Sequence, residues 1–247
     1  MSGEAPIKKY YEGVPLESMR RSLFDRYLTE SGWVESAAEK MPLRAGEPVP
    51  WYTYSAIAFL EAIVEPHFRV FEFGAGNSTL YWEKRVREVV SVEHDPVFVA
   101  YLRSNSMGKA KITLLNECGK LDKNYIDETV SEAFPDSCNK VDIAEQIREE
   151  GYLEYGDALS EFAAGDFDIA IVDGPARTLS ALNAGLHMRD GGLVLLDNSD
   201  RPESATAIAL LVEMGFRRID FWGLGPVNPY GWCTTLFFKD GAEKPFF

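Results

Sequence analysis

The residues best suited to chemistry lie between Val70 and Thr79, where an apolar run is followed by Gly74, Gly76 and three polar residues. Two glycines leave the backbone bare, so a ligand can approach it closely in the crevice where a strand ends and a helix begins. A second acid, Glu93, follows about 17 residues after Gly76, at the end of the next apolar run. An acid in that place typically accepts hydrogen bonds from the hydroxyls of a ribose, so the spacing predicts a nucleotide-type cofactor.

Charge separates the kinds of nucleotide cofactor. Glu72 precedes Gly74 by two residues, near the place of a diphosphate, and like charges at short range repel strongly in a crevice of low dielectric. Thr79 replaces the third glycine of a diphosphate-binding turn. S-Adenosylmethionine has no phosphate, and an acid would attract its ammonium and sulfonium groups. The motif therefore favours this cofactor.

This pattern resembles the class I S-adenosylmethionine-dependent methyltransferases of the Rossmann-like superfamily, whose first motif is Glu/Asp-x-Gly-x-Gly after the first strand. The resemblance extends over roughly residues 48–239. It implies that Glu72, Gly74 and Gly76 line the methionine portion of the cofactor and that Glu93 binds the ribose. The full expected cofactor-binding set is Trp51, Tyr54, Glu72, Gly74, Gly76, Asn77, Ser78, Thr79, Glu93, His94 and Asp157.

Three members of that set have a second interpretation. Asp157 stands in a Gly-Asp-Ala context in which related enzymes read the adenine amino group, yet it could equally cap a helix. Trp51 and Tyr54 could form an aromatic lid over the cofactor, or they could pack the N-terminal helix onto the core. His94, beside Glu93, is expected to be a structural residue or to lie at the adenosine edge of the site, and not to be a catalyst.

Polar residues also follow the fourth and fifth apolar runs, at the same end of the sheet. In this respect the chain resembles the metal-dependent O-methyltransferases, which implies that Asp173, Asp197 and Asn198 bind a divalent cation. Three oxygen ligands suit Mg²⁺. A metal there would lower the pKa of a bound hydroxyl and align it with the methyl group. The alternative is that Asp197 or Asp200 caps the following helix.

The chain departs from the metal-dependent pattern at the general base. The lysine expected three residues after Asp173 is Ala176, followed by Arg177, and an arginine stays protonated. We therefore expect Asp173 to act as the base, and Arg177 or Arg201 to hold an acidic acceptor. Either arginine could instead be a surface ion-pair residue.

The elements that position these residues alternate along the chain. Short runs rich in Val, Ile and Phe are separated by segments long enough for crossover helices, which is typical of an α/β protein with a parallel sheet. We expect a Rossmann-like methyltransferase fold: a mostly parallel seven-stranded sheet with an antiparallel last strand and helices on both faces. The expected strands are 70–73, 89–93, 112–115, 168–173, 193–197, 217–222 and 233–239.

Two segments lie outside this alternation. Residues 1–47 are expected to form an N-terminal helical extension, with apolar residues at helical spacing from Leu16, and residues 48–247 the cofactor-binding domain. Residues 117–150 carry ten acidic and four basic residues. This acidic insertion is expected over the edge of the sheet or over the ligand cleft; a solvated surface excursion is the alternative.

Composition bounds the function. The 247 residues carry a net charge of −14, which disfavours sequence-independent binding to nucleic acid or anionic membranes. There is no signal-peptide or membrane-spanning pattern. Cys118, Cys138 and Cys233 form neither a zinc pattern nor a disulfide framework and suit a reduced cytoplasm.

The expectation is thus a cytoplasmic methyltransferase that uses S-adenosylmethionine, with Mg²⁺ as an optional aid. Its expected partner is a small or medium-sized acceptor, methylated at oxygen. The alternatives are an NAD-dependent oxidoreductase and a non-catalytic protein that binds an adenosyl ligand. The sequence leaves the oligomeric state open.

Overall fold

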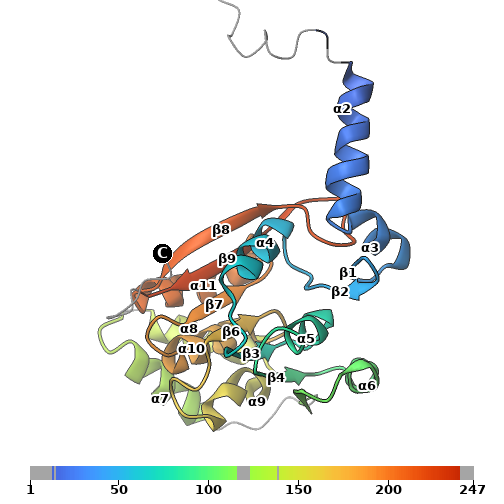
Figure 1. Ribbon diagram of the computed structural model, residues 1–247. Coiled ribbons are helices and arrows are strands. Elements are labelled where there is room, and N and C mark those ends of the chain that lie inside the picture. The colour runs from blue at the N-terminus through green and yellow to red at the C-terminus, as the bar shows by residue number, and fades with distance from the viewer. Residues whose placement is uncertain (1–12, 14, 116–122, 138, 240–247) are drawn as a thin grey trace, which may run out of the picture.

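The computed structural model describes residues 13, 15–115, 123–137 and 139–239. Their main feature is a seven-stranded sheet in the order β5-β4-β3-β6-β7-β9-β8 (Figure 1). The strands are β3 (Arg69–Phe73), β4 (Glu88–Glu93), β5 (Ala110–Leu114), β6 (Ile169–Val172), β7 (Leu193–Leu196), β8 (Arg217–Gly223) and β9 (Trp232–Phe238).

The strand directions confirm the expected fold class. Strands β3 to β7 pair in parallel, whereas β9 lies antiparallel between β7 and β8. This is the Rossmann-like methyltransferase arrangement that the alternating apolar runs predicted. The strand order reverses beside β3, and ligands in open α/β sheets bind at such a point, beyond the carboxyl ends of the strands.

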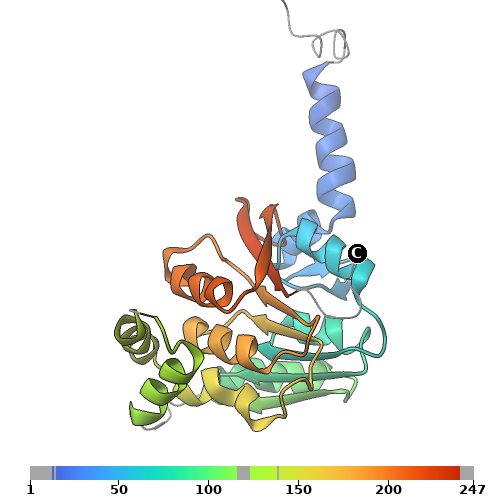
Figure 2. The same cartoon turned by 90° about the vertical axis from the view of Figure 1, so that its left-hand side faces the viewer.

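Both faces of the central strands are buried, because the side chains that point to either side of the sheet are mostly apolar. On one face Phe71, Ala170 and Val194 pack under α9 (Leu153–Asp157), α10 (Arg177–His187) and α11 (Ala205–Glu213). On the other, Val70 and Ile171 pack under α4 (Tyr54–Ile63) and α5 (Asn77–Trp82). Figure 2 shows helices on the two sides of the sheet. The remaining helix of the β-α alternation is α6 (Pro96–Asn105), between β4 and β5.

The acidic insertion forms two helices, α7 (Lys123–Ala133) and α8 (Lys140–Glu150). Their apolar residues recur at helical spacing and pack against Leu179 and Leu182 of α10 and Leu210 of α11. The described part of the insertion therefore lies on the outside of one helical layer and not over the ligand cleft. Residues 116–122 and 138, including two of the three cysteines, lie outside the described residues.

The N-terminal segment has two different parts. Helix α2 (Leu16–Ser22) and the π-helical turn η1 (Leu23–Leu28) have no buried residue and extend away from the sheet (Figure 1). Helix α3 (Trp33–Glu39) and the short hairpin β1 (Leu43–Arg44) and β2 (Glu47–Pro48) instead pack on the body, where the indole N–H of Trp33 donates to the carbonyl of Asn228. The short helices η2 (Ala158–Glu161) and η3 (Pro202–Ser204) complete the elements.

In the part of the chain that the structure describes, no helix is long and apolar enough to cross a membrane.

Candidate functional site

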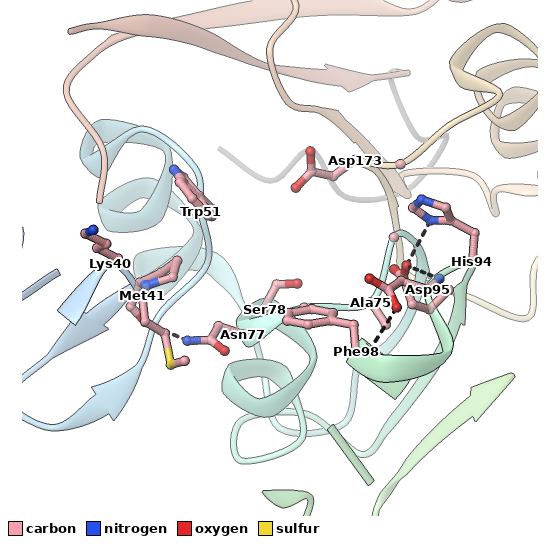
Figure 3. Close-up of a pocket in the computed structure, with 15 residues that line it drawn as sticks. Lys40, Met41, Trp51, Ala75, Asn77, Ser78, His94, Asp95, Phe98 and Asp173 are labelled. Carbon is pink, nitrogen blue, oxygen red and sulfur yellow. Dashed lines mark hydrogen bonds and ion pairs between the residues drawn. The ribbon is translucent and has the colours of Figure 1, made fainter. Parts of the chain in front are cut away.

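A cavity of about 380 Å³ opens at the carboxyl ends of β3, β4 and β6. Figure 3 shows residues from the N-terminal segment on one side of it and residues that follow β4 on the other, with Asp173 above. The lining residues are Lys40, Met41, Pro42, Trp51, Gly74, Ala75, Gly76, Asn77, Ser78, Glu93, His94, Asp95, Phe98, Asp173 and Gly174. The cavity therefore contains most of the predicted motif.

The two glycines of the turn serve different purposes. Gly74 has a φ of +112°, and a Cβ atom there would lie 2.6 Å from the carbonyl oxygen of Asp173. Gly76 has an extended backbone, and a Cβ atom there would stay 3.6 Å or more from the nearest protein atom. Glycine is thus required at position 74 because the backbone of Asp173 lies so close. Gly76 instead keeps free the space in which a ligand would lie.

Glu72 lies behind this turn and is completely buried. Its Oε2 atom accepts hydrogen bonds from the hydroxyls of Thr79, at 2.6 Å, and Ser91, at 2.7 Å, while Oε1 has no hydrogen-bond partner. Burial raises the pKa of the Glu72 carboxyl to about 7, against the opposing effect of these hydroxyls. One oxygen of an acid is therefore left unsatisfied beside the turn.

Thr79 is not a substitute for the missing third glycine. Its hydroxyl accepts a hydrogen bond from the backbone N–H of Gly76 at 3.0 Å while it donates to Glu72. It thereby connects the turn to the buried acid, which explains why a hydroxyl residue stands at this position.

Glu93 ends β4 at the pocket wall and is 5% exposed. Its Oε1 atom accepts from the backbone N–H of Asp95 at 2.9 Å and lies 2.8 Å from Nδ1 of His94. Asp95 caps α6 by accepting from the N–H groups of Val97 and Phe98. These contacts fix the Glu93 carboxylate in the place predicted for a ribose-binding acid.

The wall formed by Lys40, Met41 and Pro42 was not predicted from the sequence. The side-chain amide of Asn77 donates to the carbonyl of Pro42 at 2.9 Å, which holds this segment against the first turn of α5. No sequence motif predicts such a contact between residues 35 positions apart. Phe98 was also missed, although an aromatic residue in the first turn after the second acid was a usable signal.

Asp173 follows β6 and lines the cavity with a side chain that is 26% exposed. Burial raises the pKa of Asp173 to about 6, while the guanidinium of Arg177, 3.5 Å away, opposes that rise. A carboxylate with a pKa near neutrality can accept a proton, and Asp173 therefore remains the predicted base.

The predicted metal ligands do not form an open cation site. Oδ1 of Asp197 accepts from the indole N–H of Trp232 at 3.0 Å and from the hydroxyl of Thr234 at 2.5 Å. Burial and the charge of Asp173 raise the pKa of Asp197 to about 8, which favours a neutral carboxyl, a poor ligand for Mg²⁺.

The remaining space among these groups contains the Arg177 guanidinium, in contact with Asp173 and Asn198. In the described ranges no group of three or more His, Cys, Asp or Glu side chains is arranged to hold a metal. The donor set therefore does not fit Mg²⁺.

Four predicted cofactor residues do not line the cavity: Glu72 and Thr79 lie behind the glycine turn, and Asp157 and Tyr54 have other partners. Asp157, at the end of α9, accepts from the hydroxyl of Tyr125 at 2.9 Å and from the amide of Asn183 at 3.0 Å, and so connects α7, α9 and α10. Tyr54, the first residue of α4, is 8% exposed and packs in the core. Trp51, in contrast, lines the cavity and is 40% exposed.

Comparison with known proteins gives likenesses of architecture. No family model and no curated protein matches the chain. Cofactor-bound Rv0187 from MTB is 16% identical, with a TM-score of 0.49 over 96% of this chain and 98% of that one. A methyltransferase from Pyrococcus furiosus is 16% identical, with a TM-score of 0.47 over 89% and 99% of the two chains. Precorrin-6y C5,15-methyltransferase from Geobacter metallireducens is 9% identical, with a TM-score of 0.49 over 83% and 96%. We therefore base the function on the residues of the cavity.

Proposed function

We propose that this protein transfers the methyl group of S-adenosylmethionine to an oxygen atom of a small or medium-sized acceptor. The observation that carries this proposal is the acid Glu72, buried directly behind the glycine turn. A diphosphate at that turn would be repelled by the ionised form of this carboxyl, whereas the ammonium and sulfonium groups of S-adenosylmethionine would be attracted by it.

Two features of the cavity support the fit of this cofactor. The unsatisfied Oε1 atom of Glu72 is an acceptor that a ligand ammonium or a bridging water would complete, because buried polar atoms are rarely left unpaired. Gly76 leaves open space where the backbone and a ligand would meet.

Other residues of the cavity would bind the rest of the cofactor. Glu93, held by Asp95 and His94, would accept the ribose hydroxyls. Gly74, Asn77, Ser78 and Thr79 would shape the turn around the methionine portion.

When bound, the cofactor supplies a methyl group on a positively charged sulfur. The carboxylate of Asp173 would take up the hydroxyl proton of the acceptor as the acceptor oxygen receives the methyl group, which leaves S-adenosylhomocysteine. Arg177 orients that carboxylate, and Trp51 covers the cavity from the N-terminal side. Alignment and exclusion of water provide most of the acceleration in such a displacement.

The proposed site combines residues of the expected cofactor-binding domain with the end of the N-terminal extension, since Lys40, Met41 and Pro42 line the cavity. An NAD-dependent oxidoreductase is less well supported, because Glu93, Asp95 and Asp173 make the lining predominantly acidic. A protein that binds the cofactor without catalysis would use the same residues and is distinguished only by turnover.

The test is transfer of a labelled methyl group to a panel of small phenols, catechols and carboxylic acids. Asp173→Asn should lower kcat about 100-fold or more, the usual range for a lost base, with S-adenosylhomocysteine affinity unchanged. Asp168→Asn is the matched control: Asp168 flanks the opposite end of β6 and pairs with Arg189. It should leave kcat unchanged. Equal kcat values for Asp173→Asn and the control would contradict the assigned role of Asp173.

A further inference from the structure

The guanidinium of Arg177 lies among the three residues that the sequence suggested as metal ligands. One terminal nitrogen donates to the main-chain oxygen of Asp197. The other lies 3.5 Å from Oδ1 of Asp173 and 3.4 Å from Oδ1 of Asn198. The Arg177 side chain is only 16% exposed. A permanent positive charge is therefore held in a largely buried position between three oxygen atoms.

The backbone on both sides of this contact has an uncommon conformation. Ala176, directly before Arg177, has a φ of +55°, and Asn198 has a φ of +50°. Asparagine tolerates the left-handed region, but alanine rarely adopts it. Such conformations persist where the surroundings enforce them, and they concentrate at functional sites. The loop after β6 and the loop after β7 thus each contain one residue in a left-handed conformation beside the same guanidinium.

We propose that Arg177 is the resident cation of this site, occupying permanently the place at which a divalent ion would otherwise bind between Asp173, Asp197 and Asn198. The three contacts use three of the five N–H donors of a guanidinium. Two N–H donors of the guanidinium remain for an oxygen of the methyl acceptor, and this last consequence rests on the proposed methyl transfer. The occupancy of the site by Arg177 does not depend on that function.

The occupancy is tested by emptying the site and refilling it. Arg177→Ala leaves three oxygen atoms without their cation, so the melting temperature should fall. Guanidinium chloride at about 20 mM should then raise the melting temperature of the variant relative to wild type. If guanidinium fills about two-thirds of the sites in the variant, the melting temperature of the variant should rise by roughly 2 °C for a chain of this length. Tetramethylammonium chloride at the same concentration controls for ionic strength.

Two variants separate charge from packing. In Asp173→Asn/Arg177→Ala the charge that attracts guanidinium is gone, so the relative rise should disappear. Arg177→Lys keeps the charge and should melt closer to wild type than Arg177→Ala does. If Arg177→Ala fails to fold, a folded Arg177→Lys supports the proposal, and an equally unfolded Arg177→Lys contradicts it.

Divalent ions provide the opposite test. MnCl₂ at about 1 mM should leave the melting temperature of wild type unchanged, because Arg177 excludes the ion. A rise that Asp173→Asn abolishes would show a metal site coexisting with Arg177 and would overturn the proposal. Absence of any guanidinium effect on a folded Arg177→Ala variant would overturn it as well. Both readouts are independent of methyl transfer, so failure of the proposed function is recognised separately.

Discussion

The hydroxyl of Thr79 lies 2.6 Å from Oε2 of the buried Glu72 and donates a hydrogen bond to it. Because the same hydroxyl accepts from the N–H of Gly76, the acid and the glycine turn are connected through one side chain. Thr79 therefore fixes the glycine turn relative to Glu72, because the hydroxyl that donates to the carboxyl also accepts from the turn.

Replacing Thr79 by valine keeps its shape and removes both hydrogen bonds. The free energy of unfolding should fall by about 1–3 kcal/mol, since a buried donor and a buried acceptor lose their partner. The affinity for S-adenosylhomocysteine, measured by titration calorimetry, should fall about tenfold, equivalent to about 1.4 kcal/mol. Thr79→Ser retains the hydroxyl and should stay within about twofold of wild type. Equal losses in both variants would contradict the role of the hydroxyl.

The two glycines of the turn should respond differently to alanine. Gly74→Ala combines a φ of +112° with a contact of 2.6 Å to a backbone oxygen, so it should destabilise the fold by about 2 kcal/mol or more. Gly76→Ala meets no protein atom closer than 3.6 Å and should melt within a few degrees of wild type. Its methyl group nevertheless enters the cavity and should weaken cofactor binding at least tenfold. Denaturant unfolding and calorimetry on both variants check this contrast.

Stability should depend on pH through Glu72. Burial raises its pKa from the usual 4.5 to about 7, so between these values the folded protein holds a proton that the unfolded chain has released. The stabilising effect of that proton is fully present below pH 4.5 and is lost as pH rises toward 7. For one such group the slope reaches about 1.4 kcal/mol per pH unit.

Glu72→Gln is neutral at every pH and should reduce the slope of the unfolding free energy between pH 5 and 7. Asp173 and Asp197 also have raised pKa values, so part of the slope should remain. Glu83→Gln is the control: this carboxylate is 1% exposed and accepts from Ser106 and Met107, away from the cavity. An unchanged slope in Glu72→Gln would show that Glu72 is ionised throughout.

Asp197 should behave as a hydrogen-bond acceptor and not as a metal ligand. Asp197→Asn keeps an oxygen for Trp232 and Thr234 and should preserve both melting temperature and S-adenosylhomocysteine affinity. Asp197→Ala leaves those donors unpaired and should cost about 1–3 kcal/mol of stability. Activity should be the same with and without a chelator. Loss of activity in the chelator would instead show that methyl transfer requires a metal ion.

The sheet could be predicted from the sequence because its signals are local. Each strand from Val70 onward is a short run that contains β-branched residues, and each predicted run lies within a few residues of an observed strand. The glycine turn and the acid Glu93 were likewise predictable, because a strand, a turn and a helix fix their relative positions along the chain.

The parts that could not be predicted depend on contacts between distant residues. Asp157 was expected at the adenine, but Tyr125 and Asn183 hold it in a helix junction, and no local pattern reveals those partners. The side chain of Arg177 donates to the loop after β7, and Ala176 before it adopts a left-handed conformation that no local pattern predicts. A sequence motif specifies residue types at an edge of the sheet, but it does not specify which of them face one another.

The most direct test of the central claim is the melting temperature of the purified protein with excess S-adenosylhomocysteine, compared with excess NAD. At about 100 times its dissociation constant, a ligand adds about 2.7 kcal/mol to the stability of the fold, a rise of roughly 5–10 °C for a chain of this length. We expect that rise with S-adenosylhomocysteine and none with NAD. A rise with NAD alone, or with neither ligand, would contradict the assignment of the cavity to S-adenosylmethionine.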